Sequence, residues 1–259
     1  MELEVTPPDQ TVQLTLKDGS VLYGRVVEAG DPLSFVLVSG TEMTFPVADV
    51  RSVETVSGSV EAGEFLPEDP NRTRLFFGPT GRTLPSGQGY LAVYEIVIPF
   101  LGVGITDSFT VAGGTPLIFG DEEGGRPFWI APKLRVFGNE STHVAVGALA
   151  VRVEEEGFGL LYGVLTHGEP GGSISAGLAY GYESGGLSDR PAGMFGAELR
   201  AGRSTKIITE NYLFPGGAGL ISVGPRFFGS HLSADLGLVL PLGGGDTVVF
   251  PLVNFVYNF

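Results

Sequence analysis

VFPLVNFVYNF, residues 249–259, is the stretch that decides the fold, because its side chains alternate in character with a period of two. Phe255, Tyr257 and Phe259 fall on one face of an extended chain, and Asn254 and Asn258 fall on the other. This alternation predicts a β-strand with an apolar side and a polar side. The strand ends the sequence on an aromatic residue, with further aromatics two and four residues before it.

This closing strand resembles that of Gram-negative outer-membrane β-barrels, in which a terminal aromatic residue occupies the same register. The resemblance implies a transmembrane barrel in the bacterial outer membrane, in contact with its lipid and lipopolysaccharide. It also implies that Phe255, Tyr257 and Phe259 form an assembly signal that the barrel-assembly machinery reads. The alternative that this stretch alone leaves open is an ordinary last strand of a soluble β-sandwich.

The composition describes a β-rich chain in which only strands could span a membrane. Among 259 residues there are 41 glycines, 18 prolines, 18 phenylalanines and no cysteine, and 17% of the residues are charged. No run reaches the roughly 18 consecutive apolar residues of a transmembrane helix. A net charge of -14 argues against nucleic acid as a partner, because binding phosphates requires a basic surface. We expect no cofactor and no metal site.

Residues 11–56 are expected to form a small β domain after an N-terminal extension at 1–10. Asp18-Gly19 predicts a tight hairpin turn, and the run LKDGSVLYGRV, residues 16–26, is similar to the opening hairpin of SH3-like and Sm-like barrels. Sm-type proteins bind RNA, but acids outnumber bases in this domain. We therefore expect a docking or spacer module with a periplasmic protein partner. Residues 57–72, rich in Gly, Ser, Glu, Asp and Pro, are expected to be a linker.

The first residues, MELEV, are neither basic nor followed by an apolar stretch, so they do not form a secretory signal peptide. A chain must be exported to reach the outer membrane. We therefore expect the sequence to be a processed or trimmed form.

Residues 73–259 are expected to form the barrel. Most of their strand candidates have about the 9–11 residues that a tilted strand needs to cross a bilayer, and the number of candidates is even, as in bacterial barrels. The connections that follow even-numbered strand candidates are tight, whereas several that follow odd-numbered candidates are longer or acidic. Outer-membrane barrels show the same alternation between short turns at one end and longer loops at the other. The twelve candidates are 73–80, 88–99, 107–118, 127–137, 142–153, 158–166, 173–183, 193–202, 206–214, 219–228, 232–242 and 248–259.

Alternation within these strands predicts which side chains face lipid. Tyr90, Tyr94, Leu178 and Leu236 are among the residues assigned to the lipid face. The charged residues opposite must face the lumen, because a basic residue on the lipid face near the midplane costs roughly 2–4 kcal/mol. The predicted lumen-lining residues are Arg74, Glu95, Lys133, Arg135, Glu198, Arg200, Glu210, Arg226, Asp235, Asn254 and Asn258.

The five bases and four acids of this set indicate either a water-filled passage or a lumen filled by ion pairs. We expect a passive channel for small polar solutes. The alternatives are a closed barrel that anchors or displays the N-terminal domain, and a soluble β-rich binding protein. His143, His167 and His231 lie at or beside short turns without a Gly-x-Ser-x-Gly motif, which disfavours a membrane hydrolase. We expect no enzyme.

Deleting Phe259 is expected to impair insertion into the outer membrane, because this aromatic belongs to the implied assembly signal. Heat-modifiable gel mobility of outer-membrane fractions measures the folded yield. Recovery of the truncated protein at normal yield would show that the residue is not part of the signal.

Overall fold

The computed structural model describes residues 4–117, 126–154, 156–169, 171–183, 186–243 and 248–259, and their regular elements are β-strands apart from one 3-10 turn. The chain divides into two compact units, Met1–Glu68 and Asp69–Phe259. In the described part of the chain, no helix is long and apolar enough to cross a membrane.

The first unit is built on an antiparallel sheet with the strand order β4-β3-β2-β1-β5. The Asp18-Gly19 hairpin is confirmed: Gly19 has a φ of 91°, and the Ser20 amide donates to Oδ1 of Asp18 at 2.8 Å. This hydrogen bond lowers the pKa of the Asp18 carboxyl. The resemblance to SH3-like barrels stays a prediction. The strands are β1 (Thr11–Leu16), β2 (Val21–Glu28), β3 (Leu33–Leu37), β4 (Glu42–Phe45) and β5 (Val50–Val56), with the 3-10 turn at Val47–Asp49.

The segment expected to be a linker, 57–72, contains structure. β6 (Gly58–Glu61) and β7 (Glu64–Pro67) pair as a hairpin. Phe65 in β7 is 1% exposed and stacks on Tyr23, with 4.6 Å between the ring centroids. Residues with linker composition also form tight turns, and the apolar partner of Phe65 lies more than 40 positions earlier in the chain. Local composition therefore did not distinguish a linker from a docked hairpin.

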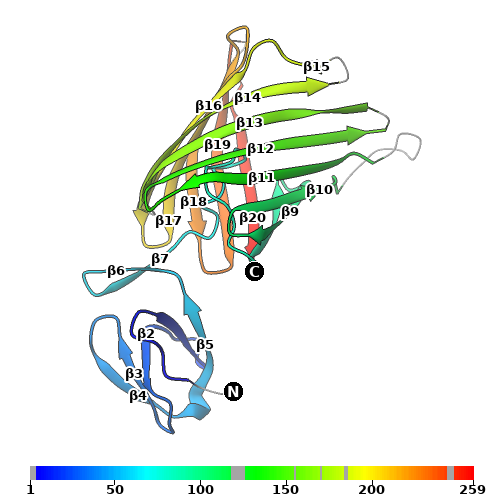
Figure 1. Ribbon diagram of the computed structural model, residues 1–259. Coiled ribbons are helices and arrows are strands. Elements are labelled where there is room, and N and C mark those ends of the chain that lie inside the picture. Colours follow the sequence, from blue (N-terminus) through cyan, green and yellow to red (C-terminus); the bar gives the residue numbers. More distant parts are fainter. Residues whose placement is uncertain (1–3, 118–125, 155, 170, 184–185, 244–247) are drawn as a thin grey trace. The chain divides into compact units, whose positions relative to one another are not determined.

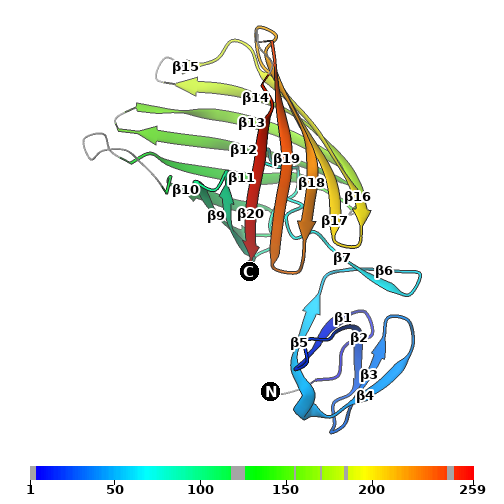
Figure 2. The same ribbon diagram turned by 180° about the vertical axis from the view of Figure 1, so that it is seen from behind.

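The second unit is an antiparallel barrel of twelve strands, which Figures 1 and 2 show from opposite sides. The last strand closes the ring against the first, from the pair Asn254↔Tyr94 to the pair Asn258↔Tyr90. The wall strands are β8 (Gly89–Tyr94), β9 (Ile98–Thr106), β10 (Phe109–Gly114), β11 (Phe128–Gly138), β12 (Thr142–Val153), β13 (Glu156–Glu169), β14 (Gly172–Glu183), β16 (Ala192–Gly202), β17 (Thr205–Leu213), β18 (Gly219–Phe228), β19 (Leu232–Leu242) and β20 (Phe250–Asn258), and the short β15 (Gly186–Leu187) pairs with β14.

The first expected strand, 73–80, is not part of the wall. It makes one isolated bridge, between Arg74 and Pro79, and its chain runs inside the ring, behind β11 and β12 in Figure 1. The count of twelve still holds, because the expected strand 88–99 reverses between β8 and β9. Glu95 and Ile96 have φ values of 49° and 68° at this turn. A β-branched residue with positive φ is rare, so the side-chain pattern did not reveal the reversal.

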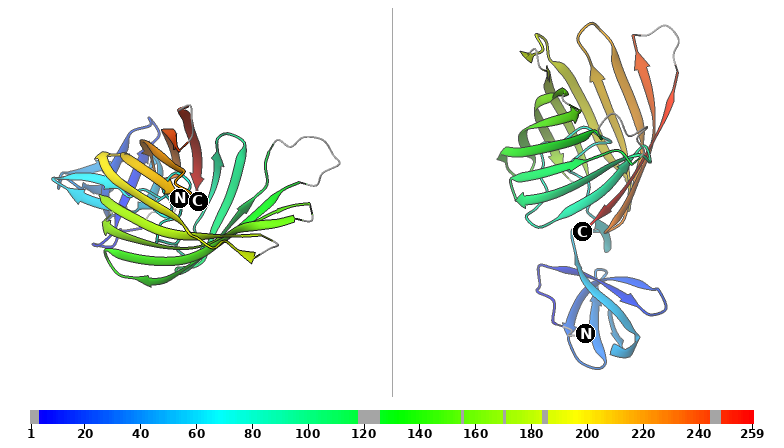
Figure 3. Two further views of the ribbon diagram at one scale, coloured as in Figure 1. Left: turned by 90° about the horizontal axis from the view of Figure 1, so that it is seen from above. Right: turned by 90° about the vertical axis from the view of Figure 1, so that its right-hand side faces the viewer.

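The alternation of turns and loops is confirmed, and it defines two ends of the barrel (Figure 3). At the short-turn end, the connections 107–108, 139–141, 170–171, 203–204 and 229–231 have two or three residues. At the loop end, the connections 115–127, 184–191 and 243–249 are longer, and parts of them lie outside the described residues. The other three loop-end connections, 95–97, 154–155 and 214–218, are shorter, with three, two and five residues.

Most strands present an apolar face outward and a polar face inward. Leu178 in β14 is 57% exposed and Leu236 in β19 is 43% exposed, as expected for the lipid face. Their inward neighbours Ser175 and Asp235 are 1% and 0% exposed. The side chains of these strands therefore follow the period of the pleat.

The assignment of Tyr90 and Tyr94 to the lipid face is wrong. Both line the interior, where Tyr94 is 5% exposed, whereas Leu91 between them faces outward and is 48% exposed. The part of the lumen next to β8 is itself apolar. The two faces of this strand consequently carry similar side chains, and alternation could not tell inside from outside.

Leu178→Arg is expected to destabilise the barrel by roughly 2–4 kcal/mol, because it places a guanidinium on the lipid face in the middle of β14. Leu187→Arg in β15 is the control: Leu187 is 59% exposed at the loop end, where we expect a cost of only about 0–1 kcal/mol. Urea titration of the protein refolded into lipid vesicles measures both. Equal losses would contradict the outward position of Leu178.

Candidate functional site

A buried charge network lies in the short-turn half of the barrel and holds the segment 69–87, called the inward segment below. Arg226 of β18 is fully buried, and its Nε lies 2.6 Å from Oδ1 of Asp235 in β19. Nη1 of Arg226 lies 3.2 Å from Oδ2 of Asp69, at the start of the inward segment. Arg74 of the same segment donates to Oδ2 of Asp235 at 2.7 Å. Opposite charges therefore tie the segment to two strands of the wall.

A second group of charges ties the inward segment to β16 and β17. Nζ of Lys206 lies 3.5 Å from Oδ2 of Asp69 and 3.4 Å from Oε1 of Glu198. Arg82, near the far end of the segment, lies 3.3 Å from the same Oε1. Lys206 is 1% exposed and Glu198 3%. Buried charges persist when they are paired, and Asp69 joins these pairs to those of Arg226.

Glu210 of β17 caps the bend of the inward segment. Its carboxylate accepts hydrogen bonds from the backbone amides of Phe77 and Gly78, both at 3.0 Å, and from the Tyr212 hydroxyl at 2.5 Å. A Cβ atom on Gly78 would lie 2.6 Å from Sδ of Met194 and 2.7 Å from the Tyr212 hydroxyl, so a larger residue here would displace these side chains. With Glu210 included, the network balances four acids, Asp69, Glu198, Glu210 and Asp235, against four cations, Arg74, Arg82, Lys206 and Arg226.

The backbone of the inward segment is satisfied by side chains of the wall. Nζ of Lys133 donates to the Thr73 carbonyl at 2.8 Å, and the amide of Gly81 donates to Oγ1 of Thr166 at 2.8 Å. Buried backbone groups need such partners, because water does not reach them. The inward polar residues of the wall thus serve the segment, which occupies the short-turn half of the lumen.

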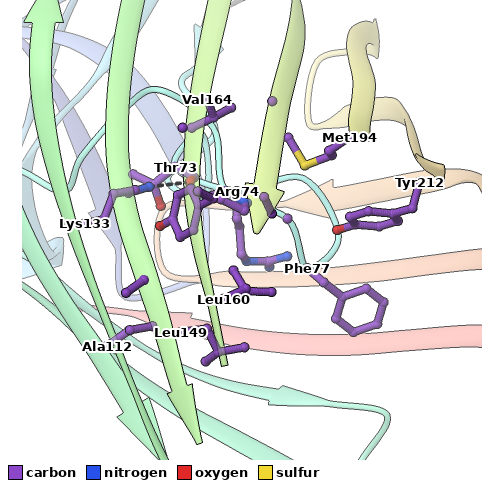
Figure 4. Close-up of a pocket in the computed structure, with 18 of the residues that line it drawn as sticks. Thr73, Arg74, Phe77, Ala112, Lys133, Leu149, Leu160, Val164, Met194 and Tyr212 are labelled. Carbon is purple, nitrogen blue, oxygen red and sulfur yellow. Dashed lines mark hydrogen bonds between the residues drawn. The ribbon is translucent and has the colours of Figure 1, made fainter. Parts of the chain in front are cut away.

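A cavity of about 400 Å³ lies on the loop-end side of the inward segment (Figure 4). Phe77 of the segment, Tyr94 of β8 and Phe100 of β9 form one of its walls, with ring centroids 5.5 Å and 5.3 Å apart in succession. Further lining residues are Tyr90, Lys133, Leu149, Leu160, Tyr162, Met194 and Tyr212. The lumen therefore has two parts, a polar half filled by the inward segment and an apolar half that is hollow.

Most of the predicted lumen residues lie in this interior. Arg74 is buried, but on the inward segment instead of a strand. Asn258 is 7% exposed near the short-turn end, where its Nδ2 donates to the His231 carbonyl at 3.2 Å. The buried wall residues are Lys133, Glu198, Glu210, Arg226, Asp235 and Asn254.

Three of the predicted residues lie elsewhere. Arg135 and Arg200 are partly exposed at the short-turn end, where Arg200 donates to the Arg203 carbonyl at 2.8 Å. Glu95 lies in the turn between β8 and β9, because the strand expected to carry it inward reverses there. These three residues therefore stay apart from the buried network.

Sequence reasoning missed three members of the network, Asp69, Arg82 and Lys206. Asp69 and Arg82 fell in stretches assigned to a linker and a loop, so no strand periodicity pointed to them. Lys206 was detectable, because it has the same parity in β17 as the predicted residue Glu210. No sequence pattern indicated the inward segment, because its residues have no periodic alternation of apolar and polar side chains.

His231 lies apart from the other two histidines, whereas His143 and His167 are one register position apart on the paired strands β12 and β13, so their side chains point to opposite faces of the sheet. Nδ1 of His167 contacts Oγ1 of Thr142 at 2.8 Å, and Nδ1 of His231 contacts the Asn258 carbonyl at 3.1 Å, while His143 lies in β12. Among the described residues there is no group of three or more His, Asp and Glu side chains placed to hold a metal ion. These contacts do not place a histidine beside a serine and a carboxylate as a hydrolase site would require.

Comparison with known proteins identifies the fold. No family model matches the sequence, and no curated protein matches it. Two solved structures of the KdgM porin, one in complex with disordered oligogalacturonate, match with TM-scores of 0.50 and 0.51 at 6% and 7% identity. Each match covers 66% of this chain and 98% of the KdgM chain. The likeness shows the fold, an antiparallel β-barrel similar to that of the KdgM porin.

A third structural match is more distant. OmpT of Vibrio cholerae, an outer membrane protein solved with its loop L8 deleted, matches with a TM-score of 0.38 at 11% identity over 96% of both chains.

Asp235→Ala is expected to destabilise the barrel by about 3–5 kcal/mol, because Arg226 and Arg74 lose a shared buried carboxylate. Asp189→Ala, at an exposed position before β16, is the control. Urea unfolding of both variants in detergent micelles measures the difference. A loss no larger than that of the control would show that the network does not hold the barrel.

Proposed function

We propose that this protein is a porin-like channel for small solutes in the bacterial outer membrane, and that the inward segment controls its lumen. The observation that carries the proposal is a closed barrel whose short-turn half is occupied by a segment held through ion pairs. Passage is passive in this proposal, and no step of it requires catalysis.

The contacts that hold the inward segment support a movable segment that controls passage through the lumen, instead of a permanent plug. Its anchors are ion pairs and hydrogen bonds, together with Leu75 and Phe76, which pack in a small apolar cluster with Ile208 and Leu252 of the wall. A buried ion pair contributes little more stability than apolar packing of the same volume. Water can replace such contacts as the segment shifts. The segment also stays tethered, because it runs directly into β8 at Gly89. A shift of the segment within the ring is therefore the proposed opening step.

We propose that the short-turn end faces the periplasm, as in other outer-membrane barrels. The inward segment enters the barrel at this end, since Nδ2 of Asn71 donates to Oγ of Ser233 at 2.6 Å. The domain at 11–56 precedes this point, so we propose a periplasmic location for it and a periplasmic protein as its partner. The net charge of -14 argues against a nucleic-acid partner.

We propose that lipid, lipopolysaccharide and the barrel-assembly machinery contact the outer face. Phe255, Tyr257 and Phe259 support this, because their side chains are 51%, 48% and 53% exposed in and after the closing strand. These residues remain the proposed assembly signal.

Planar-bilayer conductance tests the control of the lumen. The chain has no native cysteine, so Asn71→Cys combined with Ser233→Cys allows the inward segment to be locked to β19 by oxidation. We expect low conductance in the oxidised state and higher conductance after reduction. Replacing residues 72–84 with an equally long Gly-Ser chain removes the anchors Arg74 and Arg82 and is expected to raise conductance above that of the native protein.

The control is the single variant Ser233→Cys, which cannot form the lock and should not respond to reductant. Conductance that is unchanged by the lock and by the Gly-Ser replacement would contradict control by the segment. Absence of conductance in all variants would instead point to a closed barrel that anchors the domain at 11–56.

A further inference from the structure

We propose that the cavity on the loop-end side of the inward segment binds a small amphiphile, with an aromatic or aliphatic body and a carboxylate group. This inference rests on the proposed function, because it names the class of solute that the channel would carry. The carboxylate is recognised by Arg74 and Lys133, and the body by the aromatic wall.

The size and lining of the cavity fit the body of such a ligand. A volume of about 400 Å³ falls within the range of about 300–1,000 Å³ that is typical of small-molecule sites. Tyr94 and Phe100 meet edge to face, and Tyr162 and Leu160 line the same cavity. Apolar and aromatic side chains favour a ligand that buries carbon surface.

Two nitrogens of Arg74 and the Nζ of Lys133 have no carboxylate partner among the described residues, although Nη1 of Arg74 pairs with Asp235. Nε and Nη2 of Arg74 are buried, and no described residue accepts a hydrogen bond from them. Lys133 donates only to the carbonyls of Thr73 and Thr80 among the described residues, at 2.8 Å and 3.4 Å. Arg74 and Lys133 are 4% and 7% exposed. Buried donors without acceptors are rare, so these two side chains call for a ligand acceptor.

The geometry of Arg74 suits a carboxylate. Its Nη1 is committed to Asp235 and to two carbonyls of its own segment, and its guanidinium lies over the Tyr94 ring, 5.4 Å from the centroid. The remaining Nε and Nη2 form the side of the guanidinium fork that binds a carboxylate in a bidentate manner. Figure 4 shows Arg74 and Lys133 among the residues that line the cavity, with the hydrogen bond from Lys133 to Thr73 drawn as a dashed line.

Other small solutes fit less well. The described residues that line the cavity include no Asp, Glu or His, so a cation would meet two positive side chains and no carboxylate. A sugar would have to bury many hydroxyl groups against a mainly apolar wall. Thr110, one of the polar residues of the lining, already accepts a hydrogen bond from the Leu84 amide at 3.0 Å.

Equilibrium binding to the full chain tests this inference independently of conductance. Trp129 is the only tryptophan of the sequence, and its ring lies 5.4 Å from that of the cavity residue Phe100, so its fluorescence reports on this wall. The probes are 3-phenylpropanoate, 3-phenyl-1-propanol and 3-phenylpropylamine, titrated at pH 6 and also followed by calorimetry. We expect the acid to bind about tenfold or more tightly than the alcohol, and the amine to bind more weakly than the alcohol.

Two pairs of variants locate the site. Ala131→Phe fills the cavity from β11 and is expected to weaken binding of the acid about tenfold or more. Its control is Ile130→Phe on the outer face of the same strand, where Ile130 is 46% exposed. Arg74→Lys keeps the charge but removes the paired donors, so it should reduce affinity for the acid more than affinity for the alcohol. Lys133→Met should act on the acid in the same way.

The outcomes separate this inference from the channel proposal. Equal affinities for acid and alcohol, or binding that survives Ala131→Phe, would overturn the amphiphile site even if conductance behaves as proposed. Tight acid binding that Ala131→Phe abolishes and Ile130→Phe spares would support the site, whether or not the barrel conducts. Heat-modifiable mobility of each variant confirms that the barrel is folded before it is titrated.

Discussion

The structure of the barrel depends on one buried guanidinium, that of Arg226. Its nitrogens reach Asp235, Asp69 and three carbonyls of the inward segment, those of Asn71, Arg74 and Leu75. Arg226 and Asp235 are also direct partners in the ladder between β18 and β19. The same contact therefore fixes a strand register and holds the segment. Because a charge at this depth has no water to solvate it, the polar side chains of the short-turn half are arranged around it.

The lumen changes character along the barrel because two sets of strands supply it differently. β16 to β19 contribute Glu198, Lys206, Glu210, Arg226 and Asp235, which neutralise the charges of the inward segment. The strands from β8 to β13 contribute aromatic and aliphatic residues around a single cation, Lys133. Lys133 is not part of the balanced network, and it lies beside the hollow half of the lumen. A ligand with an apolar body and one negative charge matches both features of this half.

Much of the wall was predictable because it follows from local geometry. The pleat of a strand places alternate side chains on opposite faces, so Leu178 and Leu236 could be assigned outward from the sequence. Tight turns and loops alternate as their composition indicated. The strand count was right for a partly wrong reason: the inward segment was counted as a strand, and the reversal that creates β9 was overlooked.

The sequence by itself determined the β-class of this protein, the tight turns at one end of the barrel, and most inward charges. Only the tertiary structure decided that residues 69–87 fill the barrel, that Asp69 and Arg82 join the network, and that Tyr94 faces inward. The physical reason is that periodicity reports which side chains share a face of a strand. It carries no information about what occupies the space that the face encloses, and here that space is divided between a folded segment and an apolar cavity.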